Sequence, residues 1–85
     1  MLIVPSRKFI KMFKKCPQEI QAKFAERIEL FQEDKHSTLL NNHKLTGNLQ
    51  DLRSINISGD YRVIFEENEE DIVLMAIGTH SQLYE

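Results

Sequence analysis

Apolar residues in the first third of the chain repeat at the spacing of an α-helix. The first run, at i, i+3, i+4 and i+7, consists of Phe9, Met12, Phe13 and Cys16. It predicts a short amphipathic helix, for which Ser6 is a favourable N-cap. A second helical run comprises Ile20, Phe24, Ile28 and Phe31, and Pro17 suits the first position of that helix. The two helices therefore form a hairpin whose apolar faces have to be buried.

The second half of the chain changes to a period of two. In LRSINIS (residues 52–58) and YRVIFEE (residues 61–67), apolar and polar side chains alternate, which predicts two strands with one buried face each. IVLMAI, residues 72–77, is apolar at every position, as in a central strand that is covered on both faces. The turns SGD (58–60) and ENEED (67–71) separate the strands, so we expect a three-stranded antiparallel meander.

Two further segments complete the predicted fold. LIVP, at residues 2–5, favours a short strand that Pro5 ends or leaves at a sheet edge. Residues 34–51 follow neither period and are rich in turn-forming residues, so we expect a loop with a short helical turn around Leu39 and Leu40. We therefore predict an α+β fold, in which an N-terminal strand and a helical hairpin pack on a small, mainly antiparallel β-sheet.

Length and composition indicate one globular domain spanning residues 1–85. A chain of 85 residues has no room for a second domain and buries about 60–65% of its unfolded surface on folding. Its single cysteine, Cys16, excludes an internal disulfide and a cysteine-based zinc site, and fits a reducing cytoplasm. We expect no signal peptide and no membrane contact, because no apolar run approaches the roughly 20 residues of a membrane-spanning helix.

Charge is unevenly distributed, although the net charge is only −2. The basic residues between positions 7 and 23 are Arg7, Lys8, Lys11, Lys14, Lys15 and Lys23. The acidic residues between positions 66 and 71 are Glu66, Glu67, Glu69, Glu70 and Asp71. A basic face that contacts RNA, with Lys11 and Lys15 as candidates, and an ordinary solvated helix face both remain open interpretations.

The sequence lacks the motifs of most cofactor-dependent enzymes. Its three histidines form no HExxH-type ligand pair, and its three glycines form no phosphate-binding loop. Cys16 lies on an apolar helix stripe, where a cysteine is usually part of the core. We therefore expect neither a metal nor a cofactor.

Polar side chains near the predicted strands could support cleavage of RNA without a cofactor. They are His43, Arg53, Asn56, Asp60, Tyr61, Arg62, His80 and Tyr84. A histidine can take the proton of a 2′-hydroxyl or protonate a leaving 5′-oxygen, because its pKa is near neutrality. An arginine can bind two phosphate oxygens, and a tyrosine can stack on an unpaired base. On composition alone, however, many small domains would offer such a set.

Two linked segments make the interpretation more specific. HKLTGNLQDLRSINISGDYRVIFE (residues 43–66), followed by IVLMAIGTHSQLY (residues 72–84), resembles the RelE/ParE superfamily of bacterial toxins, and specifically its YafQ-like branch. The resemblance covers nearly the whole chain and implies a RelE-like fold. It also implies an mRNA endonuclease that acts on the translating ribosome in a bacterial or archaeal cytoplasm and is neutralised by a cognate antitoxin.

The resemblance assigns candidate roles to individual residues. His80 matches the histidine of the GTHS motif, the principal catalytic candidate, and His43 matches the histidine that opens the HxLxG loop. Asp60 matches the acidic residue before an aromatic, where Tyr61 replaces the common tryptophan. Tyr84 matches the terminal aromatic residue of the motif.

Two positions depart from the YafQ pattern. Asn56 stands where another histidine is expected, and Arg62 stands where RelE-type members keep a phosphate-binding arginine. We therefore expect Arg62 to stabilise the transition state, and we expect Arg53, Asn56 and Tyr61 to contact RNA. A ParE-like inhibitor of DNA gyrase and a catalytically decayed binding protein of the same fold remain the alternative hypotheses.

Overall fold

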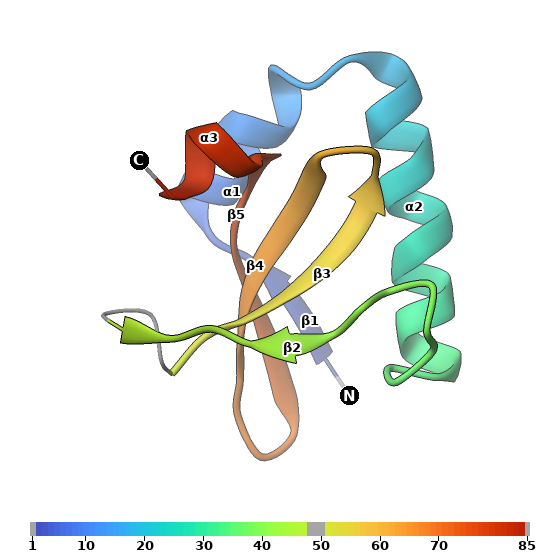
Figure 1. The fold of residues 1–85 in the computed structure, drawn as a ribbon, viewed down its shortest axis with the longest axis vertical. Helices are drawn as coiled ribbons and strands as arrows, with labels where there is room; N and C mark the ends of the chain where they lie inside the picture. Colours follow the sequence, from blue (N-terminus) through green and yellow to red (C-terminus); the bar gives the residue numbers. More distant parts are fainter. Residues whose placement is uncertain (1, 48–50, 85) are drawn as a thin grey trace.

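The protein consists of a mixed five-stranded sheet with the two helices of the N-terminal hairpin packed on one face (Figure 1). The computed structural model describes residues 2–47 and 51–84. The elements are β1 (Leu2–Pro5), α1 (Arg7–Lys14), α2 (Gln18–Glu33), β2 (His43–Lys44), β3 (Arg53–Ser58), β4 (Tyr61–Glu67), β5 (Asp71–Thr79) and α3 (His80–Tyr84). The α+β architecture predicted from the hydrophobic pattern is therefore confirmed.

The sheet has the strand order β1-β5-β4-β3-β2. β3, β4 and β5 form the expected antiparallel meander, and β1 pairs with β5 in parallel. Pro5 ends β1 at the sheet edge, where its missing N–H breaks no ladder hydrogen bond. β5 lies between β1 and β4, as its uninterrupted apolar sequence suggested.

The helical hairpin begins as its sequence predicts. Ser6 caps α1, because its Oγ accepts a hydrogen bond from the Phe9 N–H at 3.0 Å. Pro17 is the N-cap of α2 rather than its first residue, which corrects the predicted boundary by one position. Its ψ of 150° is extended, while its carbonyl oxygen already accepts from the Ile20 and Gln21 N–H groups.

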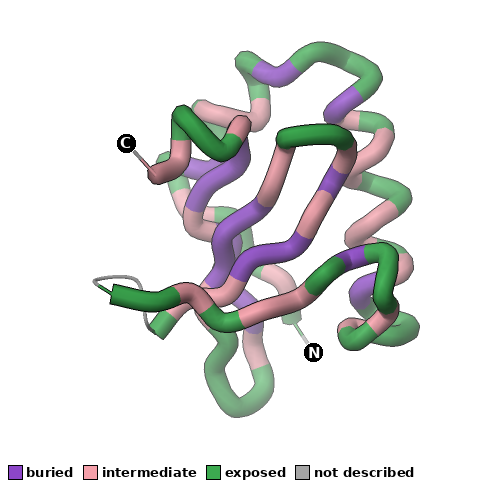
Figure 2. Tube along the Cα trace, in the orientation of Figure 1, coloured by how far each residue is buried: buried purple, intermediate pink, exposed green. Residues whose placement is uncertain are grey.

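The core lies between the hairpin and the sheet. α1 contacts β5 and α2 contacts β3, and Figure 2 shows buried segments along the three central strands. Phe31 of α2 and Phe65 of β4 meet edge to face with their ring centroids 5.3 Å apart, a favourable aromatic geometry. Cys16 belongs to the same core cluster, which confirms that it is a packing residue.

Cys16 is predicted to react slowly with alkylating reagents. Burial raises the pKa of the Cys16 thiol, because the thiolate loses its hydration in an apolar environment, and only the thiolate is nucleophilic. At pH 8 we expect iodoacetamide to modify the folded protein at least about tenfold more slowly than the urea-unfolded chain. Mass spectrometry of quenched samples measures both rates, and equal rates would contradict this packing.

The segment between α2 and β3 differs from the predicted loop. It contains β2, whose residues His43 and Lys44 pair with Ser54 and Arg53 of β3. The predicted turn near Leu40 is present as i→i+3 hydrogen bonds rather than as a helix. Leu40 is fully buried, and its carbonyl oxygen accepts from the Asn56 N–H at 2.7 Å. Residues 48–50 of the predicted loop lie outside the described residues.

A second unexpected element is α3, which follows β5 directly. The hydrophobic pattern predicts no element from His80 onward, but residues 80–84 form one short helix. Figure 1 places α3 at the same end of the sheet as the turn between β3 and β4. Within residues 2–47 and 51–84, no helix combines the length and apolarity that crossing a membrane requires.

Candidate functional site

Arg62 and Asn56 lie side by side on the sheet face that the helical hairpin leaves open. Arg62 of β4 pairs with Asn56 of β3 on one side and with Gly78 of β5 on the other. Their neighbours Ile55 and Val63 point into the core cluster, so alternation along the strands places Asn56 and Arg62 on the opposite face. The hairpin of β3 and β4 therefore places Asn56 and Arg62 together, and β5 adds Gly78 from further along the chain.

This pair contains polar atoms that are buried without a partner. The Arg62 Nε and the Asn56 Oδ1 are both inaccessible to solvent, and neither has a hydrogen-bond partner within the described residues. Buried polar atoms are nearly always paired in folded proteins, and exceptions often mark functional sites. The guanidinium of a half-buried arginine is suited to bind an anionic oxygen through the N–H groups that solvent can reach, because a charge-assisted hydrogen bond is strong there.

His80, Asp60 and Tyr84 are brought together at the end of β5. The backbone N–H of His80 donates to Asp60 Oδ2 at 3.3 Å, which links α3 to the turn between β3 and β4. The rings of His80 and Tyr84, four residues apart on α3, lie with their centroids 4.7 Å apart, as expected for an i, i+4 pair on one helix face. The Tyr84 hydroxyl is buried and has no partner within the described part of the chain.

His43 lies near the same face on the outermost strand. His43 pairs with Ser54 of β3, so their side chains lie on the same face of the sheet. Because Ser54 precedes Asn56 by two residues, this is also the face on which Asn56 lies. The Nδ1 of His43 is 2.8 Å from the carbonyl oxygen of Asn41. Because a carbonyl oxygen can only accept, Nδ1 carries the proton, and the Nε2 of the neutral ring is left as an acceptor.

The remaining candidate residues lie away from this face. Arg53 occupies the opposite side of β3 by strand alternation, and its Nε donates to Asn42 Oδ1 at 2.9 Å. Tyr61 packs against the core cluster. Lys11 and Lys15 are exposed at the end of α1, and Lys15 and Tyr61 line a small cavity of about 240 Å³. Of the predicted RNA contacts, the structure thus places Asn56 beside Arg62 and the other four elsewhere.

Sequence reasoning missed Thr79 and Gln82, which hold α3 at its start. The Gln82 N–H donates to Thr79 Oγ1 at 3.3 Å, and the Thr79 N–H donates to Gln82 Oε1 at 2.9 Å. This reciprocal pair is a capping box, a helix-start motif in which a Ser or Thr is followed three residues later by Glu or Gln. The spacing of Thr79 and Gln82 is the sequence signal that predicts it.

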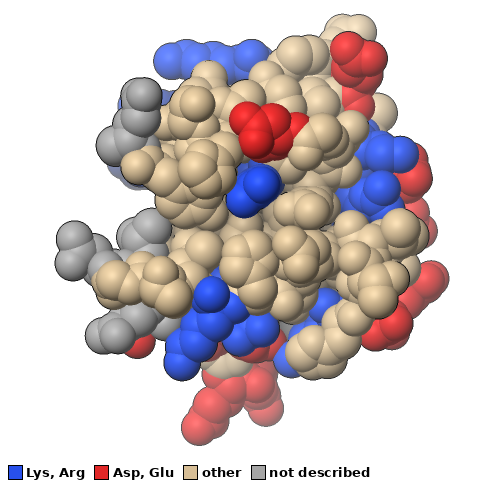
Figure 3. All heavy atoms as spheres, in the orientation of Figure 1, with Lys and Arg blue, Asp and Glu red and all other residues tan. Residues whose placement is uncertain are grey.

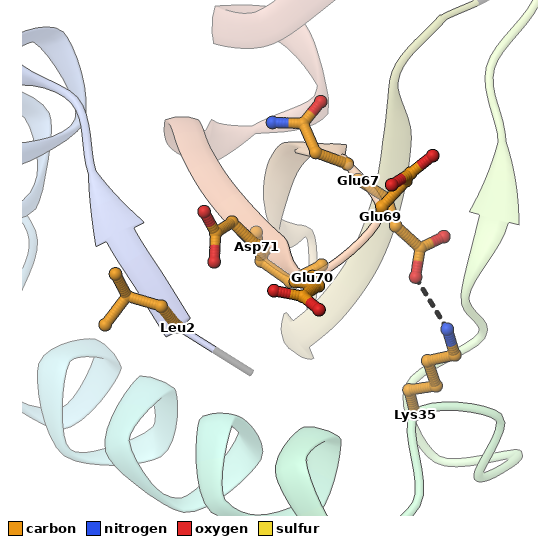
Figure 4. Close-up of a pocket in the computed structure, with 8 residues that line it drawn as sticks. Leu2, Lys35, Glu67, Glu69, Glu70 and Asp71 are labelled. Atoms are coloured by element: carbon orange, nitrogen blue, oxygen red, sulfur yellow. Dashed lines mark hydrogen bonds and ion pairs between the residues drawn. The ribbon is translucent and has the colours of Figure 1, made fainter.

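Acidic side chains gather at the end of the sheet away from α3. The acidic residues at the turn between β4 and β5 line a pocket together with Leu2 and Lys35 (Figure 4). These acidic residues are Glu67, Glu69, Glu70 and Asp71. The Lys35 Nζ lies 2.6 Å from Glu67 Oε2 and neutralises part of this charge. On the face seen in Figure 3, Lys and Arg side chains lie over β2 and beside the acid near the β3–β4 turn, whereas acids mark the β4–β5 turn. The acidic net charge therefore arises largely away from Arg62.

No group of three or more His, Cys, Asp or Glu side chains within the described residues is arranged to hold a metal ion. The chemistry available at this site comes from the imidazole of His80, the guanidinium of Arg62, the phenol of Tyr84 and the imidazole of His43. Together they can transfer protons and stabilise negative charge on a phosphoryl group.

Comparisons with known proteins identify the family. Residues 2–85 match the family model described as "Bacterial toxin of type II toxin-antitoxin system, YafQ". No curated protein sequence matches the chain.

Three solved structures illustrate the similarity of fold. YafQ from E. coli strain BL21(DE3) is 17% identical with a TM-score of 0.83, covering 98% of this chain and 97% of that chain. A chain of the E. coli DinJ-YafQ toxin-antitoxin complex is 18% identical with a TM-score of 0.81, covering 98% of this chain and 96% of that one. A chain of the RelB-RelE antitoxin-toxin complex from Methanococcus jannaschii is 22% identical with a TM-score of 0.76, covering 95% and 94%.

At these identities the structural similarity establishes the fold, and the RelE-like fold expected from the sequence is confirmed. The family follows from the family model, which agrees with the resemblance seen in HKLTG and GTHSQLY. Because that model matches nearly the whole chain, the protein belongs to the YafQ family of toxins from bacterial type II toxin-antitoxin systems.

Proposed function

We propose that this toxin is a metal-independent endoribonuclease that cleaves mRNA, with the translating ribosome as the place of action. The observation that carries the proposal is the arrangement at one end of the sheet. There, the His80 backbone N–H donates to Asp60 and the His80 ring lies against Tyr84, and the neighbouring strand β4 supplies the guanidinium of Arg62. These groups match the requirements of cleavage by an internal nucleophile.

The reaction needs no external oxidant or cofactor. A ribose 2′-hydroxyl attacks the adjacent phosphorus atom, a base accepts its proton, and the bond from phosphorus to the 5′-oxygen breaks. An acid protonates the leaving 5′-oxygen, so the products are a 2′,3′-cyclic phosphate and a 5′-hydroxyl. Negative charge grows on the equatorial phosphoryl oxygens in the transition state, where a preorganised cation is most effective.

In this proposal each residue has a defined task. His80 transfers a proton at the reacting centre, and Arg62 stabilises the negative charge on the phosphoryl oxygens. Tyr84 stacks on or positions a base next to the scissile bond. His43, whose Nε2 is free to accept, is the candidate for the second proton transfer, and Asp60 orients α3 through the His80 backbone.

The proposed partners are mRNA, the ribosome and a cognate antitoxin, and the proposed compartment is the cytoplasm. Support for an antitoxin comes from family membership and from the toxin–antitoxin complexes solved for DinJ-YafQ and RelB-RelE. The match to the YafQ family disfavours a ParE-like inhibitor of DNA gyrase, because that activity would not require the histidine of the GTHS motif. Asn56 is the position that keeps a decayed, binding-only protein as the rival.

The proposal is tested by mapping the ends of a defined mRNA after incubation of the purified toxin with translating ribosomes. We expect new 3′ ends carrying a 2′,3′-cyclic phosphate, matched by downstream fragments with a 5′-hydroxyl. Since ribosomes need Mg²⁺, metal independence is measured separately, on ribosome-free RNA at high toxin concentration with EDTA. Unchanged mRNA together with inhibited supercoiling by gyrase would establish the ParE-like alternative instead.

A further inference from the structure

The helix that carries His80 is too short to be stable by itself. α3 has five residues, whereas isolated helices shorter than about 12–15 residues are marginal in water even with favourable sequences. Its first three residues are exposed, and only Leu83 and Tyr84 are half-buried against the sheet. The orientation of His80, at the exposed end, therefore depends on specific contacts at the start of α3.

Those contacts come from the capping box described above. The side chain of Thr79 accepts from the Gln82 N–H, and the side chain of Gln82 accepts from the Thr79 N–H. Two backbone donors at the helix start are thus satisfied reciprocally. Because His80 is the residue that follows Thr79, the box fixes the backbone from which the imidazole projects.

Gly78 provides the space in which this box forms. A Cβ at position 78 would lie 2.8 Å from Gln82 Oε1 and 3.3 Å from Gln82 Cβ, and the first of these separations is shorter than real contacts. The Gln82 amide could avoid a new Cβ only by moving its oxygen, which is the atom that accepts from Thr79. Position 78 therefore requires glycine because a larger side chain would displace Gln82.

We propose that Thr79 and Gln82 are positioning residues that hold the His80 imidazole in its working orientation, with Gly78 providing the space they need. The box fixes the start of α3, and the bond from the His80 N–H to Asp60 fixes its direction relative to the β3–β4 turn. The His80 ring then rests on Tyr84. The inference rests on the proposed function for its catalytic consequence, and on geometry alone for the positioning itself.

Paired substitutions at position 82 test the role of the amide oxygen. Gln82→Leu removes the acceptor and shortens the side chain by one atom, whereas Gln82→Glu keeps both the length and the acceptor, as in other capping boxes. Because losing a cap shifts a helix equilibrium by a factor of about five to ten, we expect Gln82→Leu to lower kcat about tenfold. Gln82→Glu should keep kcat within about twofold of the unmodified toxin, and only its KM should rise, since the added charge repels RNA.

Paired substitutions at position 79 form the second arm. Thr79→Ser retains the hydroxyl acceptor and is expected to keep kcat, whereas the equally sized Thr79→Val removes it and should lower kcat as much as Gln82→Leu does. A double variant carrying both Thr79→Val and Gln82→Leu should lose little more than either single variant, because both disrupt one box. A fully multiplicative loss would contradict the shared box.

NMR separates this inference from the proposed function. In the unmodified toxin we expect a contact between the His80 and Tyr84 rings and slow exchange of the Thr79 amide proton. Gln82→Leu should lose both while the core methyl signals stay unchanged. If Gln82→Leu keeps the ring contact and the slow amide, the positioning role is wrong, whatever the cleavage assay shows. An unmodified toxin that cleaves no mRNA would overturn the proposed function, and the NMR comparison would still decide the positioning role.

Discussion

Replacing His80 by alanine is expected to lower mRNA cleavage by about 10²–10⁴-fold and to abolish growth arrest, while the fold remains intact. The large effect follows because a histidine is the proposed proton-transfer group at the reacting centre, and alanine cannot move a proton. The fold should survive because His80 is exposed and lies on the short terminal helix. Its contact with Asp60 uses the backbone N–H, which alanine retains.

His36→Ala is a matched control for this substitution. His36 is also exposed, and its backbone N–H donates to an aspartate side chain, Asp34 Oδ1, at 3.2 Å. The two substitutions therefore remove the same atoms and retain the same type of backbone contact. His36→Ala should cleave mRNA at the normal rate, because no catalytic role is assigned to that imidazole.

The measurement combines mapping of mRNA ends, growth arrest on induced expression and thermal unfolding of each variant. Equal melting temperatures for the unmodified protein and the two variants would show that only chemistry has changed. A His80→Ala variant that still arrests growth and produces the same new mRNA ends would overturn the proposed mechanism.

The parts of the fold that could be predicted are those with enough residues to show a period. α2 spans 16 residues and β5 spans 9, so the helical period of α2 and the uninterrupted apolar run of β5 are both long enough to be recognised. β2 has two residues and α3 has five, which is too few for any period. The start of α3 could nevertheless have been predicted from the capping-box spacing of Thr79 and Gln82, because this local signal does not depend on the length of the helix.

The relative placement of the site residues could be predicted only in part. A period-two pattern assigns alternate residues to opposite faces, yet Leu74 and Ile77, three apart, both lie in the core cluster. The reason is a register shift opposite Ile64 and Phe65, where β5 gains one residue relative to β4. This register shift places Gly78, rather than one of its neighbours, next to Arg62. The sequence pattern of IVLMAIGT does not predict the shift.

Asp60 and Tyr61 differ in how far the sequence predicts their environment. Asp60 was noted for its chemistry, but its contact with the His80 N–H depends on how α3 folds back at the end of β5. Tyr61 pairs with Thr79 and follows Asp60 directly, but alternation turns it toward the core cluster. The period-two pattern thus predicts the environment of Tyr61, whereas that of Asp60 depends on tertiary structure.

Removal of the Arg62 guanidinium is the second substitution with a large expected effect. Arg62→Ala should lower kcat by about 10²–10³-fold, the usual cost of losing one preorganised group that stabilises charge in a transition state. The protein should still fold, because the Arg62 Nε has no partner within the described residues whose hydrogen bond would be lost. Arg62→Lys should recover only part of the rate, since an ammonium group lacks the planar fork that binds two phosphoryl oxygens.

Arg27 provides the control that distinguishes transition-state stabilisation from general charge. Its Nε is already occupied, because it donates to the Ile57 carbonyl oxygen of β3 at 3.3 Å, so it has no free donor of the kind seen in Arg62. Arg27→Ala removes the same charged group as Arg62→Ala and should leave kcat unchanged. Single-turnover cleavage at a saturating concentration of toxin measures the rate constant of the cleavage step free of binding effects. If Arg62→Ala lowers only the affinity for RNA and not this rate, Arg62 binds the substrate without stabilising the transition state, and the proposed role is wrong.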